Sequence, residues 1–136
     1  VLAEAMRLYP PDWVIGRRCL QDEVMLGYGI PAGSNLVMSQ WIVHRDPRHW
    51  PQPEAFRPQR WLDGSTEGLP KYAYFPFGGG PRRCIGEAFA WAEGQLALAA
   101  IARRWRPTLV PGHPVEPQPL ITLRPRHGMR MRLERR

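Results

Sequence analysis

Proline and glycine constrain this sequence more than any other feature, because they interrupt almost every part of it. The 136 residues include 16 Pro and 13 Gly. Proline stops helices and glycine favours turns, so the sequence predicts a loop-rich architecture with few long regular elements. The best-defined element is a helix expected over residues 85–106, in which apolar side chains recur at helical spacing. Glu87 in its first turn and arginines in its last turn suit the helix dipole, and Pro107 ends it.

Shorter elements are expected on both sides of this helix. Residues 1–8 have a helical pattern that two prolines stop. Three short strand candidates, separated by glycines, predict a small hairpin sheet: residues 14–18, 23–26 and 35–42. Near the end of the sequence, Met129, Met131 and Leu133 alternate with arginines, which is typical of a strand with one solvated face.

Residues 44–62 combine four prolines with three large aromatic side chains. The prolines forbid a long helix, whereas Trp50, Phe56 and Trp61 favour burial. The sequence therefore predicts an ordered but irregular segment that is packed by its aromatic residues.

Composition excludes several classes of protein. Cys19 and Cys84 are the only cysteines, which excludes a disulfide framework, a cysteine-rich zinc site and an iron–sulfur cluster. No apolar run of about 18 residues exists, so we expect neither a membrane-spanning segment nor a signal peptide. The net charge of +7 comes from 18 Arg and a single Lys, Lys71. The sequence begins at Val1 within a helical pattern, which predicts a fragment of a larger protein.

The most informative segment is residues 77–86, FGGGPRRCIG, where a glycine-rich loop with a cysteine meets the N-terminus of the long helix. The helix dipole and the side chains of Arg82 and Arg83 favour the thiolate form of Cys84. The glycines allow a flat or bulky group to approach the backbone closely. If this loop is extended, Arg82 and Cys84 point to the same side.

Several interpretations of this loop are open on the residues alone. A phosphate loop is disfavoured, because no Gly-Lys-Ser/Thr follows. A nucleophilic cysteine would need a base, for which the candidates are His44, His49, His113 and His127. A thiolate ligand to a haem iron would place Arg82 on a haem carboxylate. A plain buried cysteine at a helix start is the remaining possibility.

A longer pattern favours the haem interpretation. Five residues satisfy F-x-x-G-x-R-x-C-x-G, namely Phe77, Gly80, Arg82, Cys84 and Gly86. This segment resembles the haem-binding signature of the cytochrome P-450 family. Three further segments resemble motifs of that family in the family's order: E-x-x-R at residues 4–7, HRDPRHWPQPEAFRP at residues 44–58, and P-E-R-F at residues 58–61, from which Gln59 and Trp61 depart. The resemblance covers essentially the whole chain.

The resemblance implies a haem-binding role for six residues. Cys84 would be the thiolate ligand of the iron in haem b, with Phe77 packed beside the sulfur. Gly78 and Gly86 would allow close approach of the backbone. Arg82 would pair with a haem propionate. Arg17 occupies a position where the family often places a second propionate partner, although the adjacent Arg18 could substitute for it.

The resemblance also implies a structural network away from the haem. In the family, the E-x-x-R pair joins the arginine of P-E-R-F in a buried network, and the matching residues here are Glu4, Arg7 and Arg60. We expect this network to hold the core beside the haem rather than to take part in catalysis. As an exposed pair, Glu4 and Arg7 would contribute only about 0.2–0.5 kcal/mol.

The fold and function implied by the resemblance are those of a haem-thiolate monooxygenase. The expected fold is mainly α with small β-sheets (α+β), and residues 1–136 would be the C-terminal, haem-ligating part of a single domain. The parent protein would insert one oxygen atom from O2 into an apolar organic substrate. A ferredoxin or a flavin reductase would supply the electrons. The distal oxygen-activating residues are absent from the chain, which we therefore expect to be inactive alone, and a bacterial cytoplasm is the expected setting.

Three alternatives remain at this stage. A peroxide-driven or isomerising haem-thiolate enzyme would share the same cysteine loop. A small basic nucleic-acid-binding module would account for the positive charge, but the aromatic residues cluster in the proline-rich segment and the cysteine loop rather than on a basic face, so we expect no nucleic-acid partner. A truncated product without function is the third alternative.

Overall fold

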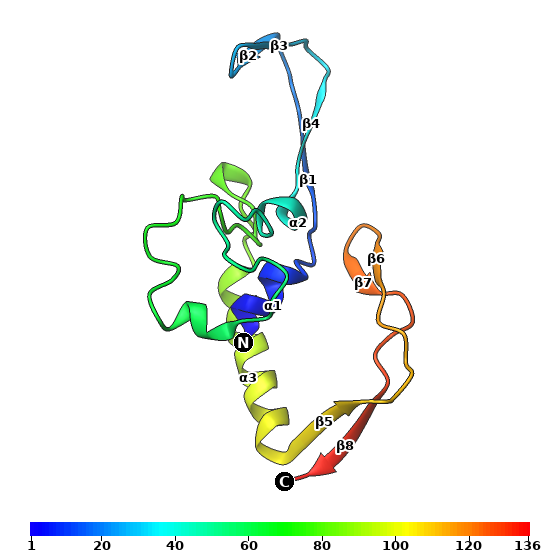
Figure 1. The fold of residues 1–136 in the computed structure, drawn as a ribbon. Coiled ribbons are helices and arrows are strands. Elements are labelled where there is room, and N and C mark those ends of the chain that lie inside the picture. Colours follow the sequence, from blue (N-terminus) through cyan, green and yellow to red (C-terminus); the bar gives the residue numbers. More distant parts are fainter.

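The computed structural model describes residues 1–136 in full. A small centre contains α1, α2 and the irregular segment that precedes α3, while a long hairpin and a C-terminal tail extend away from it (Figure 1). The elements follow in the order α1 (Leu2–Leu8), β1 (Ile15–Arg18), β2 (Glu23–Met25), β3 (Tyr28–Ile30), β4 (Asn35–Met38), α2 (Gln40–Val43), η1 (Pro58–Trp61), η2 (Gly80–Arg82), α3 (Glu87–Arg104), β5 (Trp105–Leu109), β6 (Pro117–Pro119), β7 (Leu123–Pro125) and β8 (Met131–Arg135). This mixture of helices and short strands agrees with the expected α+β class.

Each of the four sheets consists of two antiparallel strands: β1 with β4, β2 with β3, β5 with β8, and β6 with β7. The hairpin sheet expected near the N-terminus is present, but as two separate pairs along one extended arm. The strand expected over residues 35–42 is wrong in its second half, because β4 ends at Met38. Ser39 then caps α2, its Oγ accepting a hydrogen bond from the backbone N–H of Ile42 at 3.3 Å.

The long helix is shorter at both ends than the sequence predicts. It begins at Glu87, because residues 84–86 still belong to the cysteine loop. It ends at Arg104, because Trp105 is extended and opens β5, which pairs with β8. The apolar side chains of α3 are not buried: Phe89 and Leu96 are each 72% exposed. No helix of this chain has both the length and the apolar character needed to cross a membrane.

The centre of the molecule is small, and half of its buried residues are polar or charged. Only 10 of 136 residues are buried, and they include five polar or charged side chains: Glu4, Arg7, Gln40, His44 and Arg60. Trp50 is the largest apolar member, and its ring lies 5.8 Å from that of Trp61. The irregular segment is therefore packed by aromatic residues as predicted, except that the side chain of Phe56 remains 51% exposed.

The C-terminal tail returns to the centre through β6 and β7. Leu123 donates its backbone N–H to the carbonyl oxygen of Pro11 at 2.7 Å, and Trp13 donates Nε1–H to the carbonyl oxygen of Leu120 at 2.8 Å. The expectation that the last strand has one solvated face is wrong, because every residue of β8 is exposed. β8 pairs only with β5, and no other element of residues 1–136 covers this ribbon (Figure 1).

Candidate functional site

The cysteine loop, residues 75–86, is a tight turn that closes on itself. Gly78 and Gly80 have φ values of +73° and +67°, which residues with a Cβ rarely adopt. The backbone N–H of Cys84 donates to the carbonyl oxygen of Phe77 at 2.9 Å. Cys84 is exposed, and it lies two residues before Gly86, the N-cap of α3. The helix N-terminus therefore stabilises negative charge close to this sulfur.

The loop is not extended, so the condition under which strand geometry would put Arg82 and Cys84 on the same side is not met. Gly80, Pro81 and Arg82 form the 3₁₀ turn η2. Proline suits the first turn of a helix, and Gly80, the residue before this proline, adopts the positive φ. The strand rule that residues two apart share a face therefore does not apply to Arg82 and Cys84. Both side chains are exposed, and neither makes a hydrogen bond or an ion pair with another side chain.

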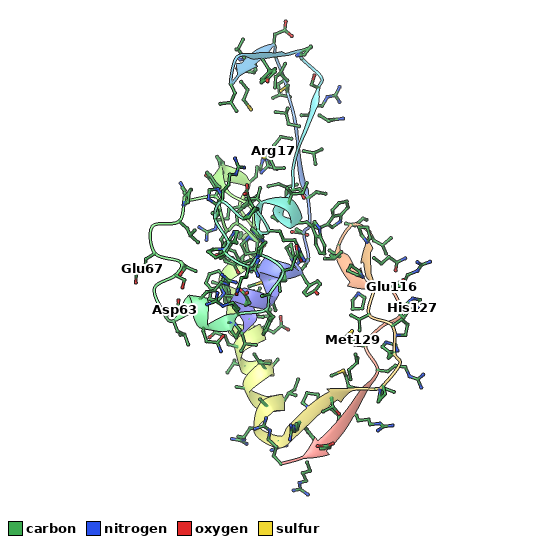
Figure 2. All side chains as sticks on the ribbon, viewed as in Figure 1. Arg17, Asp63, Glu67, Glu116, His127 and Met129 are labelled. Atoms are coloured by element: carbon green, nitrogen blue, oxygen red, sulfur yellow. The ribbon has the colours of Figure 1, made fainter.

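Arg17 lies in β1, on the same strand face as Ile15 (Figure 2). Side chains two residues apart in a strand point to the same side, and Ile15 is the first residue of β1. The Cδ1 atom of Ile15 lies 3.8 Å from the position that a Cβ on Gly78 would occupy. Arg18 points to the opposite face, where its Nη2 lies 3.8 Å from the Cβ position of Gly33. This geometry distinguishes the two adjacent arginines.

Glu4 is the centre of a buried ion network. Its carboxylate accepts hydrogen bonds from Arg7 at 2.9 and 3.0 Å and from Arg60 Nε at 3.1 Å. Trp61 Nε1–H and the backbone N–H of Arg57 complete the set at 2.9 and 3.0 Å. Burial by itself raises the pKa of Glu4, but these hydrogen bonds and the charge of Arg7 outweigh it and lower the pKa to about 2.

The two arginines of this network also clamp the irregular segment. Arg7 donates to the carbonyl oxygens of His44 and Pro53, both at 2.7 Å, and to that of Ala55 at 3.1 Å. Arg60 donates to the carbonyl oxygen of Pro51 at 3.3 Å. Every member is therefore multiply satisfied, as buried charges must be. With its pKa far below neutral pH, Glu4 suits a fixed structural anion and not an acid–base catalyst.

Two hydrogen bonds connect this centre to the segment that enters the cysteine loop. Tyr74 donates its hydroxyl to the carbonyl oxygen of Ala3 in α1 at 3.0 Å. Trp50 donates Nε1–H to the carbonyl oxygen of Ala73 at 3.1 Å. The buried network and the cysteine loop are therefore parts of one packed unit.

Beside the cysteine loop lies a hollow that the sequence does not predict. It is lined by aromatic residues, loop glycines and charged residues, among them Tyr72, Phe77, Gly79, Arg83, Glu87 and Trp91. Arg83 Nη2 lies 2.6 Å from Glu87 Oε1, a pair four residues apart that spans the start of α3. Phe77 packs against Trp91, with ring centroids 5.9 Å apart. The loop is thus braced against the first turns of α3.

The structure does not support a nucleophilic cysteine. Three of the four candidate bases are engaged elsewhere: His44 with the N–H of Phe75, His113 with the carbonyl oxygen of Gly128, and His127 with Glu116. Nor does the chain gather three His, Cys, Asp or Glu side chains into a site for a bare metal ion. The exposed thiol of Cys84 and the exposed guanidinium groups of Arg82 and Arg17, which form no ion pair, instead fit a group that carries both a metal and carboxylates.

The sequence does not predict the structural contacts of His44 and Trp61. It offers His44 only as one of four candidate bases, and Trp61 only as a departure from a motif. Trp61 uses its indole N–H to reach the carboxylate of Glu4, which a phenylalanine at that position could not do. The signal in the sequence was Trp61 itself, which brings a hydrogen-bond donor to the position where the P-E-R-F motif has phenylalanine.

Comparison with known proteins places these features in one family. The cytochrome P-450 family pattern matches residues 1–129. Cyclooctatin synthase of Streptomyces melanosporofaciens is 42% identical over 123 residues, which cover 90% of this chain and 27% of that protein. Pentalenene oxygenase of Streptomyces avermitilis is 36% identical over 136 residues, which cover all of this chain and 30% of that protein.

Solved structures show the same similarity in three dimensions. The retinoic acid-bound cyanobacterial CYP120A1 matches with a TM-score of 0.89 and 35% sequence identity, over 98% of this chain and 32% of that chain. This chain therefore spans roughly 30% of the length of these relatives. The expected fold class and family resemblance are both confirmed. The chain belongs to the cytochrome P-450 family.

Proposed function

We propose that this chain forms the haem-ligating part of a haem-thiolate monooxygenase, in which residues 1–136 are the C-terminal portion of a single larger domain. The observation that carries this proposal is the exposed thiol of Cys84. It lies without a side-chain partner at the N-terminus of α3, on a loop that is joined to a buried ion network. An anionic sulfur at a helix N-terminus is a suitable ligand for haem iron.

The proposed ligand and the two proposed propionate partners, Cys84, Arg82 and Arg17, have exposed side chains that form no ion pair. Cys84 would hold the iron of haem b, and Phe77 would pack beside the sulfur. Gly78 and Gly86 would allow the haem plane to approach the backbone, and the Cβ position of Gly86 lies 3.8 Å from Cys84 Sγ. Arg82 and Arg17 would each pair with a haem propionate. When bound, the haem supplies the oxygen and redox chemistry, while the residues of this chain bind and orient it.

The activity proposed for the whole protein is the insertion of one atom of O2 into an apolar organic substrate, with electrons from a ferredoxin or a flavin reductase. Two relatives with oxygenase in their names support this proposal, pentalenene oxygenase and cyclooctat-9-en-7-ol 5-monooxygenase of Streptomyces melanosporofaciens. Because this chain corresponds to 30% and 24% of the length of these two proteins, we propose that the distal residues that activate oxygen lie outside it. That the whole protein is located in the bacterial cytoplasm stays a prediction.

The test is the absorption spectrum of the reduced, CO-bound, haem-loaded protein. We expect a Soret band far to the red in the unchanged protein, as thiolate ligation produces. The variant Cys84→His should show the band position of His-ligated globins. Cys19→Ser is the matched control, because Cys19 is the other free cysteine and lies outside the loop. A globin-like band in the unchanged protein, or a red-shifted band in Cys84→His, contradicts the proposal.

A further inference from the structure

We propose that His44 is a positioning residue for the cysteine loop: its neutral imidazole holds the backbone N–H of Phe75 and thereby sets the position of the Cys84 sulfur. This inference rests on the proposed function of Cys84 as the haem ligand. It concerns a residue outside the loop, at the C-cap of α2.

His44 is in a position to act in this way. Its side chain is fully buried, and its ring lies next to the rings of Tyr74 and Phe75, with centroid separations of 5.1 and 5.3 Å. The Nε2 atom accepts a hydrogen bond from the backbone N–H of Phe75 at 2.9 Å. This contact joins two residues that lie 31 positions apart in the sequence. A buried hydrogen bond of this kind fixes the segment 73–75 relative to α2.

From Phe75, two backbone hydrogen bonds lead to the cysteine. The carbonyl oxygen of Phe75 accepts from the N–H of Gly78 at 2.9 Å, and the carbonyl oxygen of Phe77 accepts from the N–H of Cys84 at 2.9 Å. On its other side, His44 is tied to the ion network, because its own carbonyl oxygen accepts from Arg7 Nη1 at 2.7 Å. His44 therefore connects the buried network to the loop through its backbone and its side chain together.

The role requires a particular form of the imidazole. To accept from Phe75, Nε2 must carry a lone pair, so the proton of the neutral ring is on Nδ1. The carbonyl groups of Met6 and Arg7, in the last turn of α1, attract that proton, although no group completes a hydrogen bond to Nδ1. The hydrogen bond from Phe75 to Nε2 and the flanking rings of Tyr74 and Phe75 set the orientation of the imidazole.

The surroundings of His44 keep the ring neutral. Burial lowers its pKa most strongly, the carbonyl group of Arg7 opposes this, and the positive charges of Arg7 and Arg45 lower the pKa further, to about 4. Tyr74, the remaining titratable group against the ring, is un-ionised at neutral pH, and burial raises its pKa further above the ordinary value. At neutral pH His44 is therefore an acceptor and not a cation.

Three variants of His44 separate its hydrogen bond from its bulk. His44→Gln keeps an acceptor that can reach the position of Nε2, whereas His44→Asn keeps one only near Nδ1. His44→Leu has no acceptor at all. His127→Leu is the matched control, because it makes the same chemical change at an exposed residue.

The first measurement is the hydrogen exchange of the Phe75 amide. We expect it to exchange about tenfold faster or more in His44→Leu and His44→Asn, the factor for one lost hydrogen bond, and at the original rate in His44→Gln and His127→Leu. The second is the thiolate-type fraction of the reduced, CO-bound spectrum. We expect it to fall in the Leu and Asn variants and to be retained in the Gln variant.

The outcomes distinguish this inference from the function on which it rests. A globin-like spectrum in the unchanged protein contradicts the proposed function, while Phe75 exchange still reports on His44. A thiolate-type spectrum together with equal values in the Leu, Asn and Gln variants overturns the positioning role. If His44→Leu does not fold, the comparison of His44→Asn with His44→Gln tests the positioning role. Both side chains are amides, but only that of Gln brings its oxygen to the position of Nε2.

Discussion

The Nε atom of Arg60 lies 3.1 Å from Oε1 of Glu4, although 56 residues separate the two in the sequence, and both side chains are almost completely buried. This ion pair joins η1 to α1 across the centre of the molecule. Glu4 also pairs with Arg7, so two cations share one buried anion. Such a network tolerates the loss of a member poorly, because the remaining charges stay buried without a partner.

Replacing Arg60 with alanine is therefore expected to lower the free energy of unfolding by about 3–5 kcal/mol. The measurement is denaturant unfolding of the haem-loaded protein. Arg48→Ala is the matched control, because Arg48 pairs with Asp46 but its side chain is 82% exposed, and we expect no measurable change there. Similar stability in the two variants would show that the buried pair contributes nothing special.

Acid should weaken the protein through Glu4. Its pKa is lowered from 4.5 to about 2 in the folded state, so its contribution is present above pH 4.5 and is lost as the pH falls towards 2. A shift of this size corresponds to roughly 3 kcal/mol. Glu4→Gln removes the titrating group and should flatten the dependence of unfolding free energy on pH in this window. An unchanged slope in that variant contradicts the assignment.

His44 should cause a second loss of stability, at a higher pH than the loss caused by Glu4. Its pKa falls from 6.5 to about 4 on folding, since burial and the nearby charges of Arg7 and Arg45 disfavour the imidazolium. Between these values the unfolded chain binds a proton that the folded chain does not, so stability declines as the pH drops from 6.5 to 4, by roughly 3 kcal/mol in total. In His44→Gln this decline should be absent. Urea unfolding at several pH values between 4 and 7 measures it.

Arg17 and Arg18 should differ in their effect on haem retention. Arg17 shares a face of β1 with Ile15, which is turned to Gly78, whereas Arg18 points to the other face. We expect Arg17→Ala to release haem to an acceptor globin about tenfold faster, as the loss of one charge-assisted hydrogen bond predicts. Arg18→Ala is the control and should release haem at the original rate. The opposite order would assign the propionate to Arg18.

Replacement of Gln40 by an apolar residue is expected to stabilise the protein. Its side chain is fully buried, yet neither atom of the amide group has a hydrogen-bond partner. Replacing an unsatisfied buried polar group with an apolar one of similar shape removes a desolvation cost of about 1–3 kcal/mol. We expect Gln40→Leu to raise the denaturant midpoint of the haem-loaded protein. A lower midpoint would mean that the amide is satisfied in the complete protein.

The features that sequence reasoning predicted are those set by local spacing. Glu4 and Arg7 lie three residues apart in a helix, so their pairing follows from helical geometry alone. The strands expected over residues 14–18 and 23–26 agree with β1 and β2 within one residue at each end. The addition of Arg60 to the network came from the family resemblance, since no local rule connects residues 4 and 60.

The features that sequence reasoning missed depend on distant parts of the chain. The carbonyl partners of Arg7 come from residues 44, 53 and 55, which only the path of the irregular segment brings together. The acceptor role of His44 depends on where Phe75 lies. The end of α3 was misplaced because pairing of Trp105 with β8, a long-range contact, competes with helix continuation. The exposure of Phe89 shows that an apolar pattern identifies the apolar face of a helix such as α3, but does not identify the part of the protein that covers this face.

The four sheets share no strand with one another. Each hairpin can therefore gain or lose residues at its tip without shifting the register of any other pair. The turn between β2 and β3 is a free tip, since no atom beyond the neighbouring residues lies within 4 Å of the Cβ position at Gly27. The turn between β6 and β7 is not free, because Leu120 and Leu123 hydrogen-bond to Trp13 and Pro11. Evolution can thus remodel the N-terminal arm by insertion and deletion between β2 and β3, while the centre and the cysteine loop keep their geometry.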